Sequence, residues 1–252
     1  MKNQYNIGAL AGIALILSGS SAMAQFNLGF APEYYYWQES ANGITIHESG
    51  PRYGAELSYK QPQDEGWLWA ARVKFYYGSV HYDGQTFAGT PVSTTTDYYG
   101  GFGELRYGYR WSWTEDQYVD LMGGAGVEDW ERSLNGPGGS DENWLPIYFK
   151  AGLELCPVEK GWIGTLGVKV PVYTVETVDA SNVGGGTVTL HPGVEPSLYV
   201  EAGYQFTRRL SAVAFFDSYW FAKSPTEPAG SVLIYQPESK SYRVGVKFGW
   251  SF

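Results

Sequence analysis

The sequence predicts an all-β chain folded as a ten-stranded antiparallel transmembrane β-barrel. Two patterns lead to this prediction. Apolar and polar residues alternate with the period of a strand in ten segments, and the connections between these segments are alternately short and long. The composition agrees with both patterns, because 33 glycines, 21 tyrosines and an aromatic content of 17% favour strands and tight turns. Barrels of eight or twelve strands are the alternatives.

The ten segments share one scheme, in which one face is apolar and the other carries glycine and charge. In residues 103–111 the apolar face holds Leu105, Tyr107, Tyr109 and Trp111. Each segment is close to or longer than the 9–11 residues that a tilted strand needs to cross a bilayer. The predicted strands cover residues 26–39, 51–60, 66–81, 97–111, 118–132, 145–156, 162–176, 194–206, 210–222 and 240–252.

The connections between the predicted strands fall into two classes that alternate along the chain. The short ones are residues 61–65, 112–117, 157–161 and 207–209. The long ones are residues 40–50, 82–96, 133–144, 177–193 and 223–239, and they are rich in glycine, serine, threonine and proline. Tight turns at one end of a barrel and longer loops at the other are typical of bacterial membrane barrels. We therefore expect the long set on the external side.

The first 24 residues read as an export signal. Lys2 precedes an unbroken apolar stretch at 7–17, and Ala22-Met23-Ala24 follows as a small-residue cleavage site. The apolar stretch is too short to cross a bilayer as a helix. We expect residues 1–24 to be a signal peptide for Sec export and residues 25–252 to form a single β-barrel domain.

A soluble β-sandwich or lipocalin-like barrel is the competing fold class. Aromatic residues near the strand ends argue against it, because they resemble the interfacial girdles of membrane barrels. The last strand alternates apolar and polar residues through Phe248 and Trp250 to Phe252. This ending resembles the assembly signal of Gram-negative outer-membrane β-barrel proteins. The resemblance implies an outer-membrane location, contact with lipid and lipopolysaccharide, and recognition by the barrel-assembly machinery, and it points to no specific family.

Charge and cysteine content exclude several classes of function. The net charge of −9 gives no electrostatic basis for binding nucleic acid, which requires clustered lysine and arginine. Cys156 is the single cysteine, so the chain holds no intrachain disulfide, multi-cysteine zinc site or haem-attachment motif. The sequence offers no motif for a cofactor or a metal ion.

If the aromatic face of the strands meets lipid, the opposite face lines the lumen. That face carries basic and acidic residues in nearly equal number, and a ten-stranded barrel is narrow. Opposite charges in such a tube must pair, so we predict an ion-pair network that fills the lumen. A narrow ion path is the alternative. The predicted network comprises Glu56, Arg72, Lys74, Glu104, Arg106, Asp120, Lys150, Glu154, Lys169, Glu201, Asp217, Arg243 and Lys247.

Three histidines form a weaker candidate site. His47, His81 and His191 all fall in or beside the long connections, and therefore on the expected external rim. Imidazoles near carboxylates can bind a metal ion or act in acid–base catalysis, but their spacings match no ligand motif. The aromatic runs at 34–37 and 219–221 are interpreted as part of the outer girdle, with a stacking surface for a ligand as the alternative.

These observations predict a barrel that is a structural or binding scaffold, acting through its external loops or as the membrane subunit of a larger complex. A small channel and a surface enzyme that acts on lipopolysaccharide or peptides are the other two hypotheses. No residue is assigned a catalytic role, because the chain shows no catalytic motif.

Overall fold

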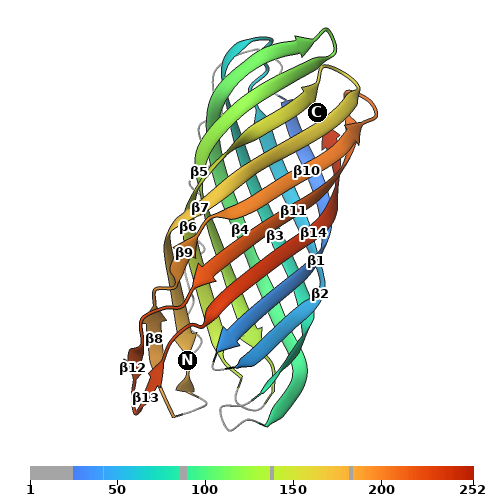
Figure 1. The fold of residues 1–252 in the computed structure, drawn as a ribbon. Helices are drawn as coiled ribbons and strands as arrows, with labels where there is room; N and C mark the ends of the chain where they lie inside the picture. Colours follow the sequence, from blue (N-terminus) through green and yellow to red (C-terminus); the bar gives the residue numbers. More distant parts are fainter. Residues whose placement is uncertain (1–24, 42, 86–89, 137–138, 182–183) are drawn as a thin grey trace.

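The computed structural model describes residues 25–41, 43–85, 90–136, 139–181 and 184–252 (Figure 1). In these residues ten long strands form a closed antiparallel barrel, which confirms the predicted fold class and strand number. Adjacent strands pair in chain order, and the pairs β1–β14 and β7–β10 complete the ring. The barrel strands are β1 (Gln25–Ala41), β2 (Ile44–Lys60), β3 (Gly66–Gln85), β4 (Pro91–Thr114), β5 (Gln117–Leu134), β6 (Asp141–Pro157), β7 (Gly161–Asp179), β10 (Ser197–Gln205), β11 (Leu210–Ala222) and β14 (Glu238–Ser251). In the described part of the chain, no helix has the length and apolar character to cross a bilayer.

An apolar band surrounds the barrel, bounded by aromatic side chains on both sides. At one boundary Tyr53, Tyr77 and Tyr99 lie side by side on β2, β3 and β4, each at least half exposed. At the other boundary lie Trp67, Trp113, Trp162, Phe206, Trp250 and Phe252. The ten residue steps from Trp67 to Tyr77 span about 33 Å of strand, or about 25 Å along the axis at a tilt of about 40°. This height matches the apolar band of outer-membrane barrels.

The strands continue past the tyrosine boundary, and this corrects three of the predicted long connections. Residues 40–50 and 82–96 are mostly strand, because pairing extends to Ala41 opposite Ile44 and to Gln85 opposite Pro91. Residues 133–144 include the end of β5 and the start of β6. Most outward side chains of these extensions are polar: serine, threonine, histidine, aspartate, asparagine and glutamine. Apolar alternation therefore ends at the membrane boundary while the backbone ladder continues, and the sequence pattern underestimates the strand length.

The two remaining long connections hold short strands at the same end of the barrel, which we call the long-loop end. β8 (Thr187–Leu190) extends the edge of β7, and β12 (Glu227–Ala229) and β13 (Val232–Ile234) form a hairpin beside it, at the lower left of Figure 1. β9 (Gly193–Glu195) pairs with β11. Leu190, Val178 and Ala229 form a small apolar core between these segments.

One predicted strand, 194–206, is interrupted in the structure. Pro196 separates β9 from β10, because proline has no N–H to donate to the ladder. Serine side chains replace the missing backbone contacts. The Ser197 hydroxyl accepts a hydrogen bond from the Trp220 amide at 3.1 Å, and the Ser218 hydroxyl accepts one from the Leu198 amide at 3.0 Å.

Candidate functional site: the barrel lumen

All thirteen charged residues expected in the lumen network form ion pairs inside the barrel. Their side chains are largely buried, and each pairs with a charge on another strand. The lumen also holds charged residues that the sequence analysis did not select. These are Glu33, Glu39, Glu48, Arg52, Lys60, Arg110, Glu128, Arg132, Glu142 and Glu176. The pairs form successive layers from the end with the short connections, the short-turn end, to the long-loop end.

The layer nearest the short-turn end is built around Lys60 of β2. Its Nζ lies 2.5 Å from Asp120 Oδ2, 2.6 Å from Glu154 Oε2 and 3.2 Å from Cys156 Sγ. The ligand atoms of these three acceptors lie within 4.8 Å of one another, a geometry that suits a metal ion. Here the lysine ammonium occupies that position and supplies the positive charge. Arg110 closes the layer with two hydrogen bonds to Asp120, at 2.7 and 2.8 Å.

The next layer is organised by Arg72 of β3. Its guanidinium hydrogen bonds to both Glu104 oxygens at 3.1 and 2.9 Å and to Glu201 at 3.1 Å. Lys247 approaches from β14 and donates to Glu56 at 2.9 Å. Lys150, from β6, lies 3.1 Å from Glu104. Charges from six strands thus meet in one cross-section, and each buried charge has an oppositely charged partner there.

Above this layer, aromatic rings join the ion pairs. Arg52 pairs with Glu33 at 2.5 Å and stacks over the Tyr35 ring at 3.8 Å from its centroid. Lys169 lies 3.4 Å from the centroid of Tyr219. Such cation–π contacts contribute up to about 2 kcal/mol each when they are desolvated. These contacts hold the aromatic rings of the half of the barrel nearer the long-loop end against the charged layers.

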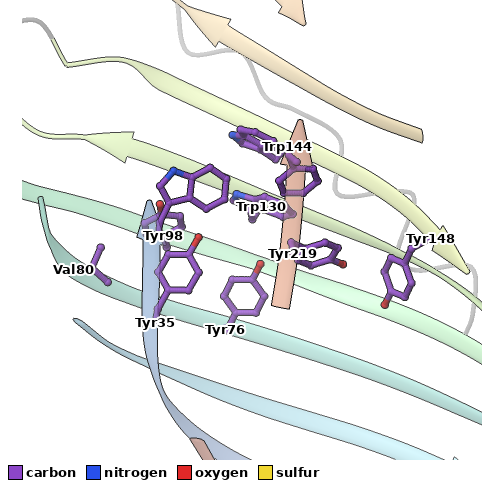
Figure 2. Packing of buried hydrophobic residues seen from close by; sticks show 10 residues of the cluster. Tyr35, Tyr76, Val80, Tyr98, Trp130, Trp144, Tyr148 and Tyr219 are labelled. Atoms are coloured by element: carbon purple, nitrogen blue, oxygen red, sulfur yellow. The ribbon is translucent and has the colours of Figure 1, made fainter. Parts of the chain in front are cut away.

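An aromatic cluster fills the lumen beyond these layers (Figure 2). We call it the aromatic plug, and its members are Tyr35, Trp37, Tyr76, Val80, Tyr98, Trp130, Trp144, Tyr148, Tyr219 and Phe221. Trp37 of β1 and Trp144 of β6 are both fully buried, and their ring centroids are 5.2 Å apart. β1 and β6 are five strands apart in either direction around the ring, so side chains from opposite walls touch.

The plug corrects the interpretation of the aromatic runs at 34–37 and 219–221. Alternate members point inward, so Tyr35, Trp37, Tyr219 and Phe221 are buried in the lumen, while Tyr34 faces outward. Both faces of these strand segments are aromatic. The alternation of apolar and polar residues therefore does not indicate which face lines the lumen. Tyrosine hydroxyl groups donate hydrogen bonds to a buried carboxylate among the rings. Those of Tyr76 and Tyr219 donate to Glu128 at 2.7 and 2.8 Å.

The outermost layer is acidic. Arg132 pairs with Glu142 at 2.6 Å, with Glu39 at 3.7 Å and with Glu48. Glu176 is 1% exposed, and neither of its carboxylate oxygens has a hydrogen-bond partner. A bulge explains why it faces the lumen. Ile147 pairs with Tyr173 but Tyr148 pairs with Pro171, so the alternation of β7 shifts by one residue before Glu176.

The structure does not bring the three histidines together. His47 and the His81–Asp83 pair face outward on the adjacent strands β2 and β3, with Asp83 directly opposite His47. His191 follows β8 and packs against Tyr173 of β7, and β4, β5 and β6 separate that strand from β3.

The surroundings of His81 do not form a catalytic triad. Its Nε2 contacts both Ser93 Oγ, at 3.4 Å, and Asp83 Oδ2, at 3.1 Å. A catalytic triad uses a different ring nitrogen for each partner, so this arrangement does not prepare Ser93 as a nucleophile. The side chains of His81 and Asp83 are also more than half exposed, which leaves the pair in solvent.

Two connected cavities occupy the charged half of the lumen. One of about 260 Å³ opens at the short-turn end, where Asn27 and Ser251 line it. The second, of about 40 Å³, shares Arg72 and Lys247 with the first and reaches Arg243, which contacts the plug residue Tyr76. The larger cavity is therefore a vestibule that narrows towards the plug.

The three residues of the expected assembly signal lie on the outward face of β14. Phe248, Trp250 and Phe252 are each about half exposed or more, and they belong to the apolar surface of the barrel. Phe252 also pairs with Phe26 through two backbone hydrogen bonds, at 2.9 and 3.3 Å, which join the last strand to the first.

Comparison with known proteins supports the architecture. Neither a family model nor a curated protein matches the chain. Among solved structures, the fold is similar to that of the outer membrane protease OmpT from Escherichia coli, with a TM-score of 0.52, 11% identity, and coverage of 91% of this chain and 96% of that chain. An outer membrane channel from Pseudomonas putida F1 matches with a TM-score of 0.41, 11% identity, and coverage of 93% and 97%. The chain therefore has the fold of the Gram-negative outer-membrane β-barrels.

Proposed function

We propose that this protein is an integral outer-membrane β-barrel with a closed lumen, and that it acts as a structural or binding scaffold. The contact between Trp37 and Trp144, which reach across the barrel from opposite walls, is the observation on which the proposal rests. Fully buried rings at this level leave no continuous water path, and the charged layers below are paired. Binding must then take place at the two ends of the barrel and not through it.

The long-loop end is the surface through which such a scaffold would meet a partner. Strand extensions with polar outward side chains raise it above the apolar band, and the β12–β13 hairpin exposes Leu233 on β13. This end would contact external molecules or lipopolysaccharide, or would hold the other subunits of a larger complex. The apolar band and its girdles would face membrane lipid.

The two other hypotheses have less support in the geometry. A channel requires a continuous polar path, which the aromatic plug interrupts. A surface enzyme at the histidines requires convergent groups, and His191 lies on the far side of the barrel from His47 and His81. We assign no catalytic residue.

The route to the membrane is part of the proposal. Residues 1–24, which lie outside the described residues, would direct Sec export and be removed after Ala24. The surface formed by Phe248, Trp250 and Phe252 would then be read by the barrel-assembly machinery. Cell fractionation tests this route: the protein should sediment with the outer membrane and lack residues 1–24 at its mature N-terminus. Recovery of an uncleaved chain in the inner membrane would contradict it.

Solute flux through proteoliposomes tests the closed lumen. Vesicles that contain the purified barrel should swell in an isotonic solution of a small sugar no faster than empty vesicles, while vesicles with an open porin should swell rapidly. Swelling that rises with the amount of barrel would contradict a scaffold with a closed lumen.

A further inference from the structure

The vestibule at the short-turn end has a positive charge that its own carboxylates do not balance. Seven basic and three acidic side chains line the cavity of about 260 Å³. Two further carboxylates, Glu104 and Asp120, contact these bases from outside the lining. Five acids therefore face seven bases, which leaves a surplus of two positive charges in a concave space. Low-dielectric walls concentrate the field of such a surplus on a small anion.

Two N–H donors in the wall of this cavity have no hydrogen-bond acceptor. The Nε atoms of Arg72 and Arg106 are buried and make no hydrogen bond, although Arg106 Nε lies 3.9 Å from a Glu104 oxygen. Other nitrogens of the two guanidinium groups bind Glu201, Glu104 and Glu154. Both residues line the vestibule, so their positive charges act on any anion inside it.

A third guanidinium lies at the mouth of the cavity. Arg209, in the turn between β10 and β11, lines the vestibule and its side chain makes no ion pair or hydrogen bond with any part of the chain that the structure describes. The neighbouring Arg208 differs in both respects. It pairs with Glu159 on the exposed surface and does not line the cavity. One arginine of the turn thus remains available to a ligand that enters the lumen.

We propose that the vestibule binds a small oxyanion, a phosphate or carboxylate group carried by a soluble molecule that enters from the short-turn end. Arg209 holds the anion at the mouth, and the positive charges of Arg72 and Arg106 attract it inside. Guanidinium groups suit this role because their fixed donors match the geometry of phosphate and carboxylate oxygens. A cavity of about 260 Å³ accepts a molecule larger than the bare ion. Because the plug closes the inner end, the ligand leaves by the same mouth.

Calorimetric titration of the full-length barrel in detergent with inorganic phosphate, at constant ionic strength, tests this site. We expect saturable binding at one site per chain. Arg209→Gln should weaken it about tenfold, as the loss of one charge-assisted hydrogen bond predicts, and the matched control Arg208→Gln should leave the affinity unchanged. Arg106→Gln, which removes a positive charge from the lining, should also weaken binding. The absence of saturable binding, or equal effects of Arg209→Gln and Arg208→Gln, would overturn the proposal.

A second titration distinguishes a soluble anion from a lipid headgroup. Dihexanoylphosphatidate carries the same phosphate chemistry on a short-chain lipid, and a site for soluble anions should bind it no more tightly than inorganic phosphate. Tighter binding of the lipid would refute the soluble source. None of these measurements depends on a closed lumen, so a conducting barrel would contradict the proposed function and leave this test valid.

Discussion

At the scale of single residues, Glu176 is the least compensated charge in the lumen. Its carboxylate is buried without a hydrogen-bond partner, and it is repelled by Glu142 and Glu39. An unpaired buried carboxylate destabilises the folded state by an amount on the order of several kcal/mol. The other acids of this layer share Arg132, which already contacts three of them. Glu176 is thus a site where a neutral side chain fits the interior better than the native one.

Replacing this carboxylate should stabilise the barrel. We expect Glu176→Gln to raise the free energy of unfolding by about 1–3 kcal/mol at neutral pH, because the neutral amide avoids the cost of either burying the charge or protonating the carboxyl group. Urea unfolding in detergent, followed by tryptophan fluorescence, measures the change. Glu142→Gln is the matched control and should lower stability, since it removes a direct partner of Arg132. Equal destabilisation by both substitutions would show that Glu176 has a partner in the folded protein.

The alternation of residues predicts side-chain orientation only where one face is polar and the ladder is regular. Arg72 and Asp120 satisfy both conditions and were placed in the lumen from the sequence. Trp37 was not, because its strand is aromatic on both faces. Glu176 was not, because the bulge at Tyr173 reverses the alternation before it. Glu48, in the same phase as Glu56, lies in an extension of β2 that the pattern reads as a loop.

At the scale of strands, glycines let large inward side chains lie flat against neighbouring backbones. The hydroxyl end of the Tyr199 ring covers both Gly152 on β6 and Gly167 on β7, and the Tyr148 ring lies over Gly126 on β5. A Cβ at any of these positions would enter the space of the ring. The glycine content noted in the sequence thus makes room for the rings and long charged side chains that fill a narrow barrel.

Two adjacent glycines on β5 provide a test of this packing. A Cβ on Gly124 would collide with the backbone carbonyl oxygen of Leu105, whereas a Cβ on Gly123 has no heavy atom closer than 3.9 Å. Gly124→Ala should therefore destabilise the barrel by about 1–3 kcal/mol, as overpacking does, while Gly123→Ala should be close to neutral. Heat modifiability on SDS gels run in the cold measures the effect. Samples are heated to increasing temperatures, and the temperature at which the folded band gives way to the unfolded band is compared between the variants and the wild type. A neutral Gly124→Ala would mean that β4 and β5 separate more easily than the structure indicates.

The strand extensions give a prediction about exposure. Thr95 and Leu105 both face outward on β4, but Thr95 lies beyond the tyrosine boundary and Leu105 lies within the apolar band. In a Cys156→Ser background, a membrane-impermeant maleimide added to whole cells should label Thr95→Cys and leave Leu105→Cys unmodified. Labelling of both positions would mean that the bilayer lies elsewhere on the barrel. Labelling of neither would mean that the long-loop end faces the periplasm.

Strand identity was more predictable than strand length. Each barrel strand was found from its apolar face, because contact with lipid imposes alternation over the membrane thickness. The extensions at 82–85 and 91–96 have no lipid contact, and pairing alone maintains them. Likewise, Pro196 divides one predicted strand in two because it removes a donor from the ladder without disturbing the apolar alternation around it.

At the scale of the whole molecule, buried aromatic rings pack together near the long-loop end of the barrel, and a cavity of about 260 Å³ opens at the short-turn end. Strand number and topology were predictable, since the alternation of residues and the turn lengths both constrain them. Contacts across the lumen were not, because they depend on strand tilt and on the stagger between strands. The approach of Trp37 to Trp144 joins residues that are 107 positions apart, and no local pattern in the sequence encodes it.

The closed lumen is the central claim, and electrical conductance tests it most directly. Purified barrel is added to planar lipid bilayers under an applied voltage, with an open porin as the positive control. The rings that meet across the barrel and the paired charges beneath them predict no steady single-channel steps above the baseline of the bare bilayer. Reproducible, long-lived conductance steps from the wild-type protein, in proportion to the amount inserted, would contradict the account.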